Sequence, residues 1–171
     1  MKKLGYSFVL VLVALLLVTG CGNDKTKNSG SSKSNSSSSK EEVITCTLEQ
    51  DQSSNGYTLE SEYKIYSDGD IVTKVETLEE VTSSNEEVLS YFEENLNDLY
   101  EEYNDKYGGY DFKVTSKGDK VTSKVKIDYT EMDLDKFVED NPVIKSYVNK
   151  NNKLTVKGIK KLYEATGATC E

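Results

Sequence analysis

The side chains in this sequence that could perform chemistry are cysteine, carboxylate, lysine and tyrosine, because histidine is absent. Without histidine, a serine or cysteine triad and a zinc site of the usual kind are excluded, and acid–base catalysis would depend on the remaining types. Asp68, Asp70 and Asp119 stand beside glycines and are interpreted as turn residues. No EF-hand loop pattern is present. We therefore predict a noncatalytic protein without a metal site or a bound cofactor.

Cys21 follows a segment with the parts of a secretory signal. Lys2 and Lys3 make its start positive, and the 11 apolar residues of 8–18 are too few to span a bilayer core, which needs about 20. Residues 17–21, LVTGC, resemble the lipobox of bacterial lipoproteins, in which the cysteine sulfur receives a diacylglycerol. The alternative is an ordinary secretory signal that happens to end at a cysteine.

The lipobox resemblance implies that residues 1–20 are a signal peptide and that Cys21 becomes an N-terminus carrying a diacylglycerol and an N-acyl chain such as palmitate. Two or more acyl chains anchor a protein stably, whereas one chain is marginal. The expected location is the extracytoplasmic face of the cell membrane of a Gram-positive bacterium. The membrane is the expected partner of the lipid anchor.

Residues 21–40 are predicted to form a flexible tether, since after the cysteine they are mainly Ser, Lys and Asn. They carry a net charge of +3, from four Lys and one Asp. Residues 41–171 hold 15 Lys against 29 acidic side chains, a net charge of −14. An acidic domain of this kind is not expected to bind nucleic acid.

Residues 41–171 are the size of one domain, and the hydrophobic periodicity within them predicts an α+β fold. Apolar residues alternate, as in strands with one buried face, around positions 44–48, 57–65, 71–77, 110–114 and 121–129. Steps of three and four residues predict a helix from a capping box at Ser84 and Glu87 to Gly108. Weaker helical patterns cover 133–147, interrupted near Pro142, and 155–166.

An internal similarity relates residues 63–73 to residues 112–122, at an offset of 49. Both segments read as β-hairpins that turn at a glycine, and a helical pattern follows each one. We therefore predict two hairpin-plus-helix units with a leading strand, forming an antiparallel sheet of about five strands with the helices packed on one face. Duplication and convergent hairpin chemistry both remain open as the origin of the similarity.

Short motifs between residues 57 and 167 are similar to those of the YehR-like family of small bacterial lipoproteins. These motifs are Tyr63-Lys64, Gly69-Asp70 with Val72-Thr73-Lys74, Ile127-Asp128-Tyr129-Thr130 with Asp133-Leu134, and a last helix ending at Gly167. The resemblance implies an α+β fold of this layout. It implies no activity and assigns no functional residue.

Cys46 and Cys170 are the two cysteines that remain if Cys21 is acylated. An exported domain resides where disulfides persist, and a pair near opposite ends of one domain is suited to form one. Cys46 shares the inward face of the first strand, and the chain after the last helix can return beside it. We predict a disulfide; the alternatives are two buried thiols or a metal-binding pair.

Two kinds of function remain open. The first is a noncatalytic module that binds a protein, peptide or envelope component, which an exposed apolar or aromatic sheet face would favour. The second is a domain that binds a small ligand or cation in a pocket lined by carboxylates and tyrosines, which a closed pocket would favour. Most of the 12 tyrosines, including Tyr63, Tyr103 and Tyr129, are expected in the core, although tyrosines can also form a binding surface.

Overall fold

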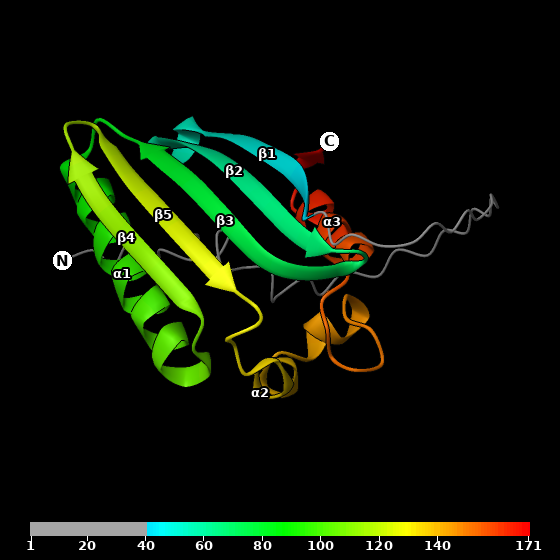
Figure 1. Ribbon diagram of the computed structural model, residues 1–171. Coiled ribbons are helices and arrows are strands. Elements are labelled where there is room, and N and C mark those ends of the chain that lie inside the picture. Colours follow the sequence, from blue (N-terminus) through cyan, green and yellow to red (C-terminus); the bar gives the residue numbers. More distant parts are fainter. Residues whose placement is uncertain (1–40) are drawn as a thin grey trace.

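The computed structural model describes residues 41–171 (Figure 1). The predicted signal peptide 1–20, the lipidation site Cys21 and the linker up to residue 40 lie outside the described residues. The strands are β1 (Glu42–Gln52), β2 (Tyr57–Asp68), β3 (Ile71–Thr82), β4 (Tyr110–Lys117), β5 (Lys120–Asp128) and β6 (Thr169–Cys170). The helices are α1 (Glu86–Tyr107), α2 (Leu134–Asp140) and α3 (Val156–Ala165), with short 3₁₀ helices η3 (Ser53–Asn55) and η4 (Pro142–Ser146).

All six strands form one antiparallel sheet in the order β4-β5-β3-β2-β1-β6. The prediction of an antiparallel α+β fold is confirmed, and the strand beyond the expected five is the two-residue β6 at the edge of β1. Each hairpin, β2-β3 and β4-β5, is followed by a helix, as the sequence pattern indicated.

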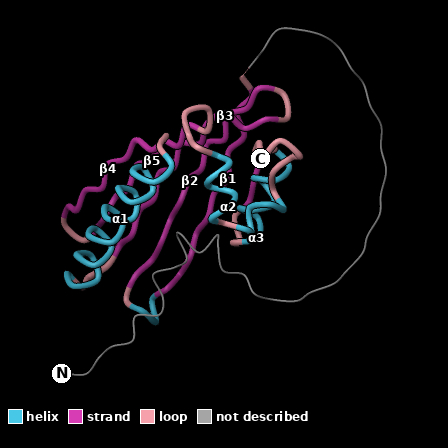
Figure 2. The backbone as a smooth tube through the Cα atoms, turned by 90° about the horizontal axis from the view of Figure 1, so that it is seen from below, coloured by secondary structure: helices cyan, strands magenta, loops and turns pink. Residues whose placement is uncertain are grey.

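The helices cover one face of the sheet, and the other face is open (Figures 1 and 2). α1 contacts β4 and β5, whereas α3 contacts β3 and β6. Two clusters of buried side chains fill the space between the layers. One lies under α1 and includes Val81, Phe92 and Val121, and the other lies around α2 and α3 and includes Ile65 and Ile159. The cavity described below lies where these clusters meet.

The two hairpins turn in the same way, with a two-residue connection that begins at glycine. Gly69 has φ of 58° and Gly118 has φ of 65°, a conformation that residues with a Cβ rarely adopt. Asp70 and Asp119 complete these turns, and Asp68 is the last residue of β2. Asp70 and Asp119 are therefore turn residues, as predicted, and Asp68 is the strand residue directly before the first turn. The two turns lie at opposite ends of β3, because Ile71 pairs beside the first turn and Thr82 pairs beside the second.

Two details differ from the sequence prediction. The N-cap of α1 is Asn85, not Ser84, because the Asn85 side chain accepts a hydrogen bond from the backbone N–H of Glu87 at 2.9 Å. In β3, a bulge shifts the pairing so that Val72, rather than Ile71 or Thr73, faces the core at the start of the strand.

Candidate functional site

A cavity of about 120 Å³ lies between the inner face of the sheet and the helices. Its walls come from strands β1 to β5, from all three α-helices, and from residues beside them. Most of the lining side chains are aliphatic or aromatic, among them Leu48, Ile127, Ile159 and Leu162. An apolar cavity of about 150 Å³ is large enough to take up benzene, so this volume suits a small organic group.

Glu79 is the carboxylate of this cavity. Its side chain projects from β3 into the layer between sheet and helices and is only 4% exposed. The hydroxyl of Tyr100 on α1 donates a hydrogen bond to Glu79 Oε2 at 3.2 Å. Within the described part of the chain, none of the ion pairs includes Glu79. Burial therefore raises the pKa of Glu79 to about 8, and the hydrogen bond from Tyr100 opposes this shift only in part.

Two buried hydroxyls flank Glu79 across the sheet. Ser61 on β2 and Ser123 on β5 are its direct partners in the strand register. Their exposed fractions are 5% and 1%, and neither Oγ atom has a hydrogen-bond partner within the described residues. Buried polar atoms without partners are uncommon, because each loses its hydration without replacement. The row from Ser61 through Glu79 to Ser123 is thus a band of polar atoms in an otherwise apolar layer.

Tyrosine rings surround the cavity on several sides. The lining tyrosines are Tyr63, Tyr100, Tyr103, Tyr110, Tyr129 and Tyr163. Tyr63 and Tyr163 stack with ring centroids 4.2 Å apart, which joins β2 to α3. Burial raises the pKa of both phenols, and it raises that of Tyr100 as well, so these groups stay uncharged near neutral pH. The prediction that tyrosines are mainly core residues holds for Tyr63 and Tyr129, whereas Tyr103 is half-buried.

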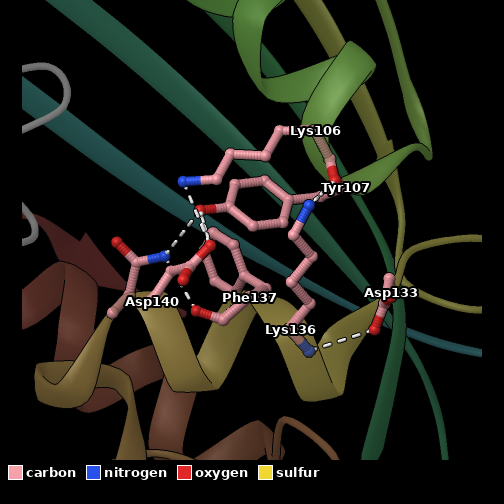
Figure 3. Close-up of polar contacts among 7 residues, drawn as sticks. Lys106, Tyr107, Asp133, Lys136, Phe137 and Asp140 are labelled. Atoms are coloured by element: carbon pink, nitrogen blue, oxygen red, sulfur yellow. Dashed lines mark hydrogen bonds and ion pairs between the residues drawn. The ribbon is translucent and has the colours of Figure 1, made fainter.

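Three half-buried aromatic residues, Tyr103 of α1, Tyr110 of β4 and Phe137 of α2, line the cavity, and we call them its rim. Next to this rim, a group of polar contacts holds α2 against the end of α1 (Figure 3). Asp140 Oδ2 accepts a hydrogen bond from the Tyr107 hydroxyl at 3.1 Å and pairs with Lys106 Nζ at 3.0 Å.

Contacts with Lys106, Lys136 and Phe137 fix the ring of Tyr107. The ammonium groups of Lys106 and Lys136 lie 5.1 and 5.7 Å from its centroid, and the Phe137 ring meets it edge-on at 5.1 Å. Lys106 also keeps the pKa of the Asp140 carboxyl below its usual value. These contacts position α2, and through Phe137 they position one wall of the cavity.

Cys46 and Cys170 form a disulfide, as predicted, with Cα atoms 4.0 Å apart. They face each other in the pairing of β1 with β6. Thr45 and Glu171 extend this pairing with reciprocal backbone hydrogen bonds of 3.2 and 2.9 Å. The alternatives of free thiols and of a metal-binding pair do not apply. In the described part of the chain, no group of three or more Cys, Asp or Glu side chains could hold a metal ion.

The outer face of the sheet is charged and divided by sign. Acidic side chains dominate its β1–β3 part, with Glu49, Asp51, Glu60, Glu62, Glu76 and Glu80. Lysines dominate its β4–β5 part, with Lys113, Lys117, Lys120, Lys124 and Lys126. The exposed large apolar side chains of residues 41–171 are Val43 and Leu78. The outer face therefore lacks the apolar or aromatic patch that would favour the first kind of function.

Sequence reasoning did not single out Glu79. The alternation predicted for residues 71–77 has its buried positions at odd numbers, and extending it assigns Glu79 and Val81 to the buried face of β3. An acidic residue at a position that the alternation assigns to the buried face is the signal that was available. The residues that complete the site, Tyr100 on α1 and Phe137 on α2, come from elements whose placement above Glu79 requires the tertiary structure.

None of the helices in residues 41–171 is long and apolar enough to cross a membrane. No family model matches the chain, and no curated protein matches its sequence significantly. Two solved structures match the chain. A protein from Streptococcus pneumoniae TIGR4 shares 13% identity over 91% of this chain and 99% of its own, with a TM-score of 0.47. The E. coli YehR protein shares 17% identity over 77% of this chain and 91% of its own, with a TM-score of 0.53. The described chain therefore has a YehR-like fold.

Proposed function

We propose that this protein is a lipid-anchored extracytoplasmic protein whose α+β domain binds a small molecule in the cavity between sheet and helices. One observation carries the proposal: a buried carboxyl group, that of Glu79, lines the cavity within walls that are mostly apolar, and two buried hydroxyls without partners lie beside it in the sheet. Small-molecule sites typically combine apolar walls with a few polar groups that orient the ligand. The proposed role is noncatalytic.

The binding part of the proposal can be tested with the full-length protein in detergent solution, using methyl-labelled Ile, Leu and Val. A panel of neutral, cationic and anionic fragments is added, and methyl signals are followed by NMR. We expect some fragments to shift the signals of Leu48, Ile159 and Leu162, which line the cavity. Val43 and Leu78 are exposed and serve as internal controls. If no fragment in the panel shifts the cavity signals, the cavity is not a binding site.

The anchoring part of the proposal depends on Cys21. The disulfide of Cys46 with Cys170 supports export, because disulfides persist mainly in oxidising compartments. Cells fed a fatty-acid probe should label the mature protein, and Cys21→Ser should abolish the label and release the protein from the membrane fraction. Cys170→Ser, which leaves the lipobox intact, should keep the label. Label retained in the Cys21→Ser variant would contradict lipidation.

A second candidate function is supported by the division of charge on the outer face of the sheet. We propose that this face docks an envelope protein whose surface has complementary acidic and basic areas. Crosslinking on intact cells with the anchor preserved should capture such a partner. Lys113→Glu with Lys124→Glu, which reverses the sign of two outward β4–β5 lysines, should abolish the capture, whereas Glu79→Gln in the cavity should not. Equal capture by both variants would remove this candidate.

A further inference from the structure

The charge balance of the cavity is one-sided. Glu79 is its carboxylate, and among the described residues no lysine lines it. The other polar side chains of its lining are hydroxyls of threonine and tyrosine, and Ser61 and Ser123 add two more beside Glu79 in the sheet. These groups can donate hydrogen bonds but carry no positive charge. A carboxylate in this place would thus have no counter-ion from the described chain. A ligand that brings positive charge would supply what the cavity lacks.

The walls restrict the type of cation. Metal ions such as Ca²⁺ and Mg²⁺ need about six or more oxygen ligands, and in residues 41–171 no group of side chains offers even three acidic or sulfur ligands. Aliphatic and tyrosine side chains make up most of the lining. Aromatic ring faces attract cations, and ammonium groups bearing alkyl substituents are recognised by several such rings together.

We infer that the cavity binds a small organic cation, an ammonium group on an apolar body, and that Glu79 gives up its proton when the cation enters. The inference rests on the proposed function and names its ligand class. In the exchange, the O–H bond of the Glu79 carboxyl breaks, the proton leaves to solvent, and the ammonium group balances the new carboxylate. The net charge of the cavity is zero before and after.

Other titratable groups around Glu79 do not compete for this role. They are the lining tyrosines, and burial raises the pKa of each: Tyr63 from β2, Tyr100 and Tyr103 from α1, Tyr129 after β5 and Tyr163 from α3. The pKa of Tyr110 at the rim is also raised by burial. Glu79, with a pKa of about 8, is therefore the cavity group that changes charge near neutral pH.

Choline and its uncharged isostere 3,3-dimethylbutan-1-ol test the inference, because they differ in charge but hardly in shape. With the full-length protein in detergent, we expect choline to shift the methyl signals of Leu48, Ile159 and Leu162. Its apparent dissociation constant should fall about tenfold per pH unit between about pH 5.5 and 7.5, with about one proton released per choline bound. Proton release is measured by calorimetry in buffers of different ionisation enthalpy.

Glu79→Gln should weaken choline binding at least tenfold and remove its pH dependence. The matched control is Glu80→Gln, because Glu80 is the next residue in β3 but pairs with Lys120 on the outer face at 2.9 Å. This control should bind choline as the unmodified protein does. Methyl spectra of both variants show whether the fold is retained.

Three outcomes would overturn the inference. If the alcohol binds as tightly as choline and binding weakens with rising pH, the ligand is an uncharged group bonded to protonated Glu79, and the proposed function stands without the cation. If choline fails to shift the cavity signals while other fragments of the panel do so, the ligand class is wrong and the proposed function again stands. If no fragment shifts them, both are wrong.

Discussion

Glu79 is the residue in which burial and charge conflict most strongly. A fully buried carboxylate without a counter-ion is unfavourable, so the folded protein keeps the group protonated over a wider pH range than the unfolded chain does. The hydrogen bond from Tyr100 reduces this conflict but does not remove it. Burial of the polar row from Ser61 to Ser123 is therefore unfavourable in the absence of a ligand, which supports the proposed binding role.

The first prediction concerns the pH dependence of folding. Between the usual carboxyl pKa of 4.5 and the folded value of about 8, the folded protein binds one more proton at Glu79 than the unfolded chain. The stabilisation from this proton is complete below the lower value and is lost as pH rises through about 8. Within that window, the free energy of unfolding of the unmodified protein should fall by about 1.4 kcal/mol per pH unit, measured by urea titration. Glu79→Gln should remove this decrease.

The control for this prediction is Glu80→Gln, which changes an outward carboxyl that pairs with Lys120. It should retain the slope of the unmodified protein. Equal slopes for Glu79→Gln and the unmodified protein would show that Glu79 titrates normally in the folded state and is open to solvent.

At the scale of elements, alternation and helical periodicity predicted most of what the structure shows. Strands alternate because one face of the sheet is buried and one is open, and this difference is written in the sequence. The bulge between Tyr66 and Ser67 could not be predicted from the sequence, because it depends on how two strands pair. The rim formed by Tyr103, Tyr110 and Phe137 was not predictable either, because residues from three separate elements meet there only after folding.

Helix α3 lies very close to the backbone at Tyr147, because Gly158 in its first turn has no side chain. A Cβ atom added at Gly158 would lie 2.0 Å from the carbonyl oxygen of Tyr147 and 2.9 Å from Thr155 Oγ1. The Thr155 hydroxyl caps this helix by accepting a hydrogen bond from the N–H of Gly158 at 3.0 Å. The first turn of α3 therefore packs directly on the backbone that precedes it.

The second prediction follows from this contact. Gly158→Ala should lower the free energy of unfolding by about 1–3 kcal/mol, because the backbone must shift to admit the methyl group, although alanine favours helix more than glycine does. Lys157→Ala, at the exposed neighbouring position, should change stability by less than about 0.5 kcal/mol. Urea unfolding measures both. A Gly158→Ala variant as stable as the unmodified protein would show that α3 can move away from Tyr147 at little cost.

At the scale of the whole molecule, the disulfide joins the two ends of the described chain. Cys46 lies in the first strand and Cys170 in the last, separated by 124 positions, and the sheet hydrogen bonds of β6 depend on the same contact. Nearly every element lies within the closed loop. The covalent link therefore restricts the unfolded chain as a whole and also holds β6 and the end of α3 beside β1.

The third prediction is that this link provides much of the stability of the domain. In the chain-entropy description, closing a loop of more than 100 residues contributes up to about 5 kcal/mol, which is comparable with the total stability of a small domain. In a Cys21→Ser background, where Cys46 and Cys170 are the remaining cysteines, reductant should lower the free energy of unfolding by about 2–5 kcal/mol. Adding Cys46→Ala and Cys170→Ala should give the same low stability and make it insensitive to reductant.

Because Cys46 is fully buried, alkylation must be carried out in urea, where the mass should change only after reduction. Alkylation of both cysteines in urea without reductant would mean that the bond is absent in solution, and β6 would then be held to β1 by backbone hydrogen bonds alone.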